Sequence, residues 1–176
     1  MYEGAAPGDH DPPSYSPRRL PAYRFVPGET PHPTRDPEGH SHGEHVSAPT
    51  RWRPEEWRDL EDWLWAIDLF NHGFWWESHE ALEGLWHAAG RTTPPARFVQ
   101  SLVHLAAACL NHRRGHTRAA RRQAARAVRG LRAARAMGSV VMGVELVPLA
   151  KEVVRAFAGR ESSPAGLRIA LVEASR

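Results

Sequence analysis

Two side chains that can bind metals or transfer protons lie four residues apart in the segment FWWESHEALEGLWHAAG, residues 74–90. On a helix, His79 and Glu83 would stand one turn apart on the same face. Three tryptophans, Trp75, Trp76 and Trp86, surround that face and make it the most apolar side of the segment. A carboxylate there is unfavourable unless it is paired, hydrogen-bonded or bound to a metal. We therefore predict that His79 and Glu83 are largely buried, and that they either contact each other or share a partner from the next helix.

The same helical projection places the other acids of this segment elsewhere. Glu77 is expected to point outward, and Glu80 to lie at the flank of the apolar face. On the next helix a polar but uncharged stripe contains Gln100, His104 and His112. We expect this stripe to face His79 and Glu83 inside a bundle.

Two interpretations of this cluster remain open. In the first, it is a buried hydrogen-bonded network that fixes the register of the helices. In the second, it binds a divalent metal, as His and carboxylate groups do in helical bundles. The candidate metal ligands are His79, Glu83, His104 and His112, and the candidate catalytic groups are Glu83 and Glu80. The spacing is not that of the HExxH metalloproteases, because position 83 is Glu and not His.

A second histidine cluster occurs nearer the N-terminus, in PHPTRDPEGHSHGEH, residues 31–45. Spacings of this kind can bind zinc or nickel, although in a flexible segment such binding is often adventitious. The alternative is a lid that brings its polar side chains to the helical site. The residues expected to line the site under that interpretation are Gln100, Trp76, Trp86, His32, Arg35 and His40, and the remaining histidines of the cluster are His42 and His45.

Helical periodicity provides the elements that would position these groups. Apolar residues recur at steps of three and four from Pro54 to Gly73, and later helices are expected at 74–89, 96–112, 117–136 and 146–157. The segment between Phe98 and His112 has no charged residue, which indicates a central, buried helix. The fold class is therefore all-α, a compact bundle of four to five helices.

Residues 1–50 form a proline- and histidine-rich arm that precedes the bundle of residues 51–160 and a tail of residues 161–176. The arm contains ten of the fifteen prolines, so it cannot be a helix or a central strand. Its first twenty residues are predicted to be disordered. Tyr23, Phe25 and Val26 are expected to dock the arm on the bundle and so to bring His32, Arg35 and His40 over one end of the helices. The segment 167–171 could be a strand or a helix.

Charge is unevenly distributed, because residues 84–144 contain eleven arginines and no acid. This favours attraction between two halves of one fold, with a nucleic-acid surface as the other interpretation. A single cysteine excludes an intrachain disulfide framework. No apolar run is long enough for a membrane helix and no signal-peptide pattern is present, so a cytoplasmic protein without membrane association is expected.

Three function hypotheses follow, and whether the protein is an enzyme is left open. The leading one is a metal or small-molecule site between the second and third helices, with hydrolysis as the candidate reaction and a divalent metal as the candidate cofactor. The alternative is a non-catalytic helical scaffold that binds a protein partner or a second copy of the chain. The third, and least favoured, is nucleic-acid binding through the arginines of the fourth helix, Arg118, Arg122, Arg126 and Arg129.

The stretch AIDLFNHGFWWESHEALEGLW, residues 66–86, resembles the domain-of-unknown-function family 309, whose members are small all-helical bacterial and archaeal proteins. The family pattern is F-N-x-G-x-[FY]-[FWY]-E-[AS]-H-E-x-x-E-x-x-W. The residues that match it are Phe70, Asn71, Gly73, Phe74, Trp76, Glu77, Ser78, His79, Glu80, Glu83 and Trp86. Downstream similarity covers Arg97, Phe98, Gln100, Ala107, Ala108 and Gly115. The arm is similar to that of an arm-bearing subgroup through Pro27-Gly28, Pro31-His32-Pro33 and Gly39-His40-Ser41. The resemblance implies an all-helical fold and assigns no activity.

Overall fold

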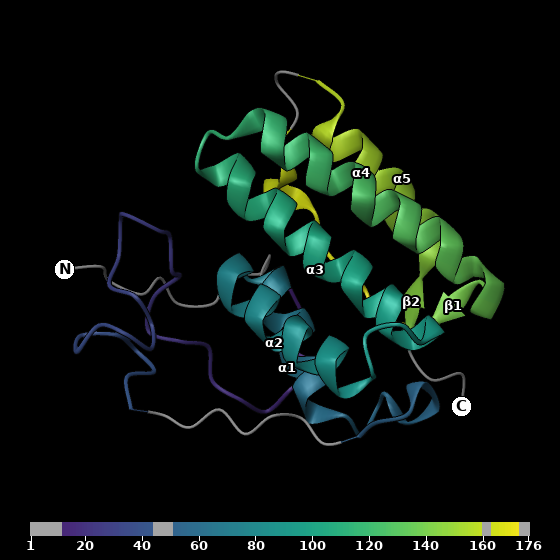
Figure 1. The fold of residues 1–176 in the computed structure, drawn as a ribbon, viewed down its shortest axis with the longest axis horizontal. Coiled ribbons are helices and arrows are strands. Elements are labelled where there is room, and N and C mark those ends of the chain that lie inside the picture. The colour runs from purple at the N-terminus through teal and green to yellow at the C-terminus, as the bar shows by residue number, and fades with distance from the viewer. Residues whose placement is uncertain (1–11, 44–50, 160–162, 173–176) are drawn as a thin grey trace.

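In the described part of the chain five helices follow one another, each packed against the next (Figure 1). The computed structural model describes residues 12–43, 51–159 and 163–172. The helices are α1 (Glu61–Asn71), α2 (Trp75–Ala88), α3 (Pro94–Arg113), α4 (Thr117–Ala134) and α5 (Leu146–Phe157). Short 3-10 turns are η1 (Pro54–Glu56), η2 (Arg135–Met137) and η3 (Pro164–Gly166). The predicted all-α bundle is confirmed.

Helix α3 lies at the centre, between α2 and α4, as its lack of charge predicted (Figure 1). Each of its residues from Phe98 to His112 is buried or half-buried. On its α4 side the approach is close, because a Cβ added at Gly130 would lie 2.5 Å from the Cβ of Ser101. A glycine at that point lets the two helices pack backbone to backbone.

The expected start of the first helix was wrong. Pro54 begins only the 3-10 turn η1, and α1 begins seven residues later, at Glu61. The apolar spacing continues across the break because Trp57 and Leu60 also pack against the core. The indole of Trp57 lies where a side chain at residue 143 would stand, 2.6 Å from its Cβ position, so only Gly143 fits there.

A two-stranded hairpin that the sequence did not indicate separates α4 from α5. Its strands are β1 (Val140–Val141) and β2 (Val144–Glu145), paired antiparallel. The two turn residues, Met142 and Gly143, both have positive φ, as the tight turn of a two-residue hairpin requires. These strands are too short to show the alternation by which strands are predicted.

The segment 167–171 is extended, which decides between the two conformations that the sequence left open. Leu171 forms an isolated antiparallel bridge with Val144. Asn71, at the end of α1, is buried and fixes the middle of this segment. Its side-chain amide donates to the Ile169 carbonyl at 2.9 Å and accepts the Ile169 N–H at 2.8 Å. The last described residues are thus part of the core.

Within the described residues, no helix is both long and apolar enough to cross a membrane.

Candidate functional site

A cavity of about 760 Å³ lies between the arm and helices α1 and α2. Its size is in the range of small-molecule sites. The wall contains two indoles, two imidazoles and both signs of charge. The principal lining residues are Trp65, Trp76, His32, His40, Ser41, Arg18, Arg19, Arg35, Asp62, Glu77 and Glu80. The cavity is therefore amphipathic, and half of it comes from the arm.

The beginning of the arm is tied to α1 by a buried carboxylate. Asp68 is 1% exposed and accepts the N–H of Tyr15 at 2.8 Å and that of Ser16 at 2.7 Å. Burial raises the pKa of Asp68, and these backbone donors partly oppose the rise. The phenol oxygen of Tyr15 accepts the Leu171 N–H at 3.1 Å, so the arm also contacts the C-terminal segment. Disorder was predicted for residues 1–20; within them, Tyr15 and Ser16 make these contacts with the bundle, and residues 1–11 lie outside the described part.

The apolar residues of the arm dock on the bundle, as the sequence predicted. Phe25 and Val26 are buried, and Tyr23 is half-buried. The Phe25 ring packs edge-on against the Trp76 indole, with centroids 4.9 Å apart. His32 contacts the same indole at 5.3 Å. Docking places His32, Arg35 and His40 in the wall of this cavity, and not above His79 as expected, because the cavity lining does not include His79 or Glu83.

Glu77 contradicts the expectation that it points outward. Only 6% of its side chain is exposed, because the arm covers this face of α2. Its Oε1 accepts the Phe25 N–H at 2.8 Å and lies 3.2 Å from His40 Nε2. Its Oε2 is buried without a hydrogen-bond partner among the described residues. Burial raises the pKa of Glu77, and the Phe25 N–H and His40 act in the opposite direction.

A tight turn in the arm presents His40 and Ser41 to the cavity. The Ser41 N–H donates to the Pro33 carbonyl at 3.0 Å, and the His40 N–H donates to the Tyr23 hydroxyl at 3.2 Å. A Cβ at Gly39 would lie 2.3 Å from the carbonyl oxygens of both His32 and Pro33, so glycine is required there. His42, beside this turn, is exposed, and His45 lies outside the described residues. Neither Ser41 nor Glu77 was predicted as a site residue from the sequence, although Ser41 adjoins His40, which was.

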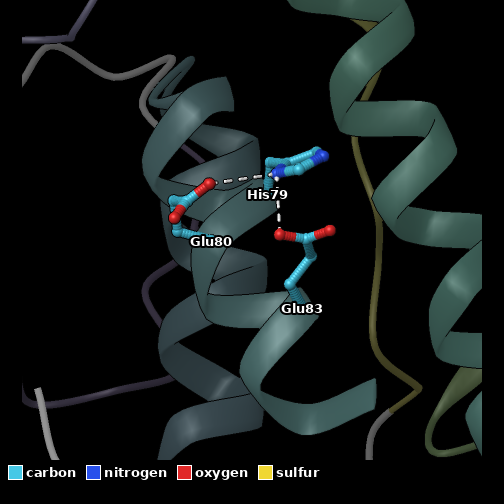
Figure 2. Close-up of side chains that lie close together, drawn as sticks. All are labelled: His79, Glu80 and Glu83. Carbon is cyan, nitrogen blue, oxygen red and sulfur yellow. Dashed lines mark hydrogen bonds and ion pairs between the residues drawn. The ribbon is translucent and has the colours of Figure 1, made fainter. Parts of the chain in front are cut away.

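The pair predicted from the sequence, His79 and Glu83, also lies on α2 (Figure 2). His79 Nδ1 is 3.4 Å from Glu80 Oε1 and 3.9 Å from Glu83 Oε2. One potential ligand atom from each residue falls within 4.8 Å of the others. The predicted contact between His79 and Glu83 is therefore present, and Glu80 joins them.

The predicted burial of His79 and Glu83 is found only in part. The side chains of His79, Glu83 and Glu80 are 26%, 39% and 51% exposed. The reason is that the core of α2 is formed by Leu82 and Leu85, which are fully buried. The tryptophans do not enclose the cluster either, since Trp76 faces the arm and the Trp86 indole donates to the Arg91 carbonyl at the other end of the helix.

The polar stripe of α3 does not complete the cluster. His104 is half-buried, and burial lowers its pKa, with Arg126 adding to the effect, while a hydrogen bond to Gln123 opposes it. His79 makes only a smaller electrostatic contribution to His104. The ring of His112 packs instead against Phe157 of α5, at 6.1 Å. Among the described residues, the group that could hold a metal therefore consists of His79, Glu80 and Glu83, without His104 or His112. Gln100, the third residue of the stripe, is half-buried on α3.

Helix α4 divides into two faces as predicted. Ala120, Ala124, Ala127 and Leu131 are buried against the bundle. The arginines of the opposite face, Arg118, Arg122, Arg126 and Arg129, are exposed.

Comparison with known families agrees with the sequence motif. Residues 63–123 match the family model described as a domain of unknown function, DUF309. The resemblance is thereby confirmed over this segment. Comparison with curated proteins and with solved structures gave no match.

The DUF309 segment spans most of α1, all of α2 and α3, and the start of α4. It contributes Glu77, Glu80 and Trp76 to the cavity and contains the whole His79 cluster. Residues 12–43 of the arm lie outside it, so the cavity combines the DUF309 segment with a covering that the family model does not include.

Proposed function

We propose that this protein binds a small organic molecule in the cavity between the arm and helices α1 and α2. The observation that carries the proposal is the Glu77 carboxyl group. It is almost fully buried, it lines the cavity, and one of its oxygens has no partner among the described residues. An unsatisfied buried acceptor is unfavourable, so a hydrogen-bond donor on a ligand would be stabilising there.

The rest of the wall supports a ligand with a planar apolar body and an acidic group. The Trp65 and Trp76 indoles offer apolar surface for a ring. Arg18 is already paired with Glu61 and Asp62. Arg19 and Arg35 have no ion pair among the described residues, so they are free to attract a carboxylate or phosphate.

The test is ligand binding by the full chain. Benzoate, indole-3-acetate and adenosine monophosphate would be titrated against the protein, with tryptophan fluorescence and the melting temperature as readouts. We expect at least one to bind, and Arg35→Gln to weaken it about tenfold. Arg155→Gln, on the exposed face of α5, is the matched control. No binding by any probe, or equal weakening by both variants, would contradict the proposal.

A second candidate function rests on the group formed by His79, Glu80 and Glu83. Their ligand atoms are close enough for modest side-chain rotations to bring them onto one divalent cation. Such a cation could activate a bound water for hydrolysis. This cluster is on the DUF309 segment and needs no residue of the arm.

Metal analysis of protein purified without a histidine tag tests this second candidate. Glu83→Gln should keep the fold, because Glu83 is 39% exposed, and should lower the content of bound divalent metal. Glu152→Gln, on an exposed position of α5, is the control. Equal metal content in wild type and Glu83→Gln would remove Glu83 from the set of ligands.

A further inference from the structure

Two successive hydrogen bonds join Ser41, His40 and Glu77 in the wall of the cavity. His40 Nδ1 lies 2.9 Å from Ser41 Oγ, and His40 Nε2 lies 3.2 Å from Glu77 Oε1. All three residues line the cavity. A hydroxyl, an imidazole and a carboxyl group in this order are the parts of an activated serine nucleophile.

The hydrogen-bond partners indicate which imidazole nitrogen carries the proton. Glu77 Oε1 already acts as an acceptor, because it receives the Phe25 N–H at 2.8 Å. His40 Nε2 is therefore assigned as the donor to this oxygen. That leaves a lone pair on Nδ1, which accepts the O–H of Ser41. A general base needs this protonation state.

The three residues differ in burial as an activated nucleophile requires, with the nucleophile more exposed than the groups that support it. The side chains of His40 and Glu77 are each 6% exposed. Ser41 is only partly buried. Ser41 is thus more accessible to a molecule in the cavity than the side chains of His40 and Glu77, which are largely shielded from water.

His40 is held firmly in place. Its N–H donates to the Tyr23 hydroxyl, and its ring packs edge-on against the Tyr23 ring with centroids 4.7 Å apart. The Tyr23 hydroxyl in turn donates to the Pro31 carbonyl at 2.9 Å. A base fixed in this way needs little reorganisation before it accepts a proton.

We propose that Ser41 is the nucleophile of an acyl-transfer reaction, with His40 as its general base and Glu77 as the positioning residue, on esters of small acids that carry an anionic group. This proposal rests on the proposed function, since it requires that the cavity admits a small molecule. It adds the reaction and the substrate class to that function.

In the first step Ser41 Oγ attacks the ester carbonyl carbon while His40 Nδ1 takes the hydroxyl proton. The carbon–oxygen bond to the leaving alcohol then breaks, and His40 returns the proton to that alcohol. Water attacks the acyl-serine in the second step, again losing its proton to His40, and this releases the acid and restores Ser41. The Ser41 N–H is already bonded to the Pro33 carbonyl, so Arg19 and Arg35 are the cationic groups of the wall available to the developing oxyanion.

The test uses the full-length protein and a fluorophosphonate probe, which forms an oxygen–phosphorus bond with an activated serine and releases fluoride. We expect one equivalent of label, located at Ser41 by tandem mass spectrometry and abolished in Ser41→Ala. His40→Gln should slow labelling about 10²–10⁴-fold, the usual contribution of a general base. Ser139→Ala, an exposed serine next to the hairpin, is the control and should label as wild type does.

The variant Glu77→Gln distinguishes a positioning role of Glu77, exerted through His40, from a role in stabilising the fold alone. It keeps an oxygen for the Phe25 N–H but removes the charge that stabilises a protonated imidazole. We expect the pH at which labelling is half-maximal to fall in this variant, a change that a purely structural role of Glu77 would not produce.

Two outcomes would overturn the inference, namely no label on folded wild-type protein, or equal labelling of wild type and Ser41→Ala. Binding of benzoate, indole-3-acetate or adenosine monophosphate is measured on the same samples. If binding is present and labelling absent, the nucleophile is wrong and the proposed function stands. If both are absent, both are wrong.

Discussion

The docking of the arm can be tested by removing a single aromatic side chain. Phe25 is 7% exposed and packs against Trp76 and His32. Burial of such a side chain contributes roughly 1.5–3 kcal/mol, and Phe→Ala in protein cores costs about 3–5 kcal/mol. The arm lies at the edge of the core, so we expect Phe25→Ala to weaken docking by about 2–4 kcal/mol. At 1.4 kcal/mol per factor of ten, the undocked population should rise about 30- to 700-fold.

Hydrogen exchange measured by mass spectrometry reports this population directly, because local opening sets the exchange rate of protected amides. The reporters are the N–H of Val26, bonded to Thr30, and that of His40, bonded to Tyr23. Peptides of α3 should exchange as in wild type, which would show that the opening is local. Leu20→Ala, at an arm leucine that is 37% exposed, is the control and should have little effect. Unchanged exchange of both reporters in Phe25→Ala would show that the Phe25 ring does not hold the arm on the bundle.

Three further predictions concern the fold and the buried carboxyl group. Asn71→Ala should lower the free energy of unfolding by roughly 2–5 kcal/mol in urea titration, because two buried groups of Ile169 lose their partner, whereas Asn111→Ala should cost much less. Gly130→Ala should destabilise by about 1–3 kcal/mol in the same assay, because the new methyl group meets Ser101, and a gain in stability would contradict the close packing of α3 and α4. Burial raises the pKa of Glu77, so the folded state holds this proton more tightly than the unfolded state and stability falls as the pH rises above the usual 4.5 of a glutamate. Glu77→Gln should flatten that decline in pH-dependent unfolding, and identical slopes would show that Glu77 does not contribute to it.

The parts of the fold that follow from local pattern were predictable. The apolar seam of α4 predicts which face of that helix packs against the bundle. The absence of charge in α3 predicts that this helix is central. Neither prediction needs information from the rest of the chain. The hairpin at residues 140–145 and the segment at 167–171 were not predictable in the same way. Each is too short to show a periodic pattern, and Ile169 is held by a contact with Asn71, which lies 98 residues earlier in the sequence.

The site was predictable only in part, because the helical projection assumes that one face of α2 meets the core and the opposite face meets water. The projection correctly brought His79 and Glu83 together. It failed for Glu77 because the arm covers the face that was expected to be solvated. The burial of Phe25 was predicted, but the position on α2 against which it packs could not be read from spacing alone. A buried carboxyl group was therefore expected on one face of the helix and is found on another.

Glu80 links the two candidate sites of α2. It lines the cavity beneath the arm, and it also belongs to the group formed with His79 and Glu83. A divalent cation held by that group would neutralise a negative charge in the cavity wall, and it would leave Glu77 as the remaining acid of α2 there. An anionic ligand would then meet less repulsion from the wall, while the arginines of the arm would be unaffected. Occupation of the cation group should therefore strengthen the binding of acids in the cavity, and by linkage such acids should strengthen the binding of the cation.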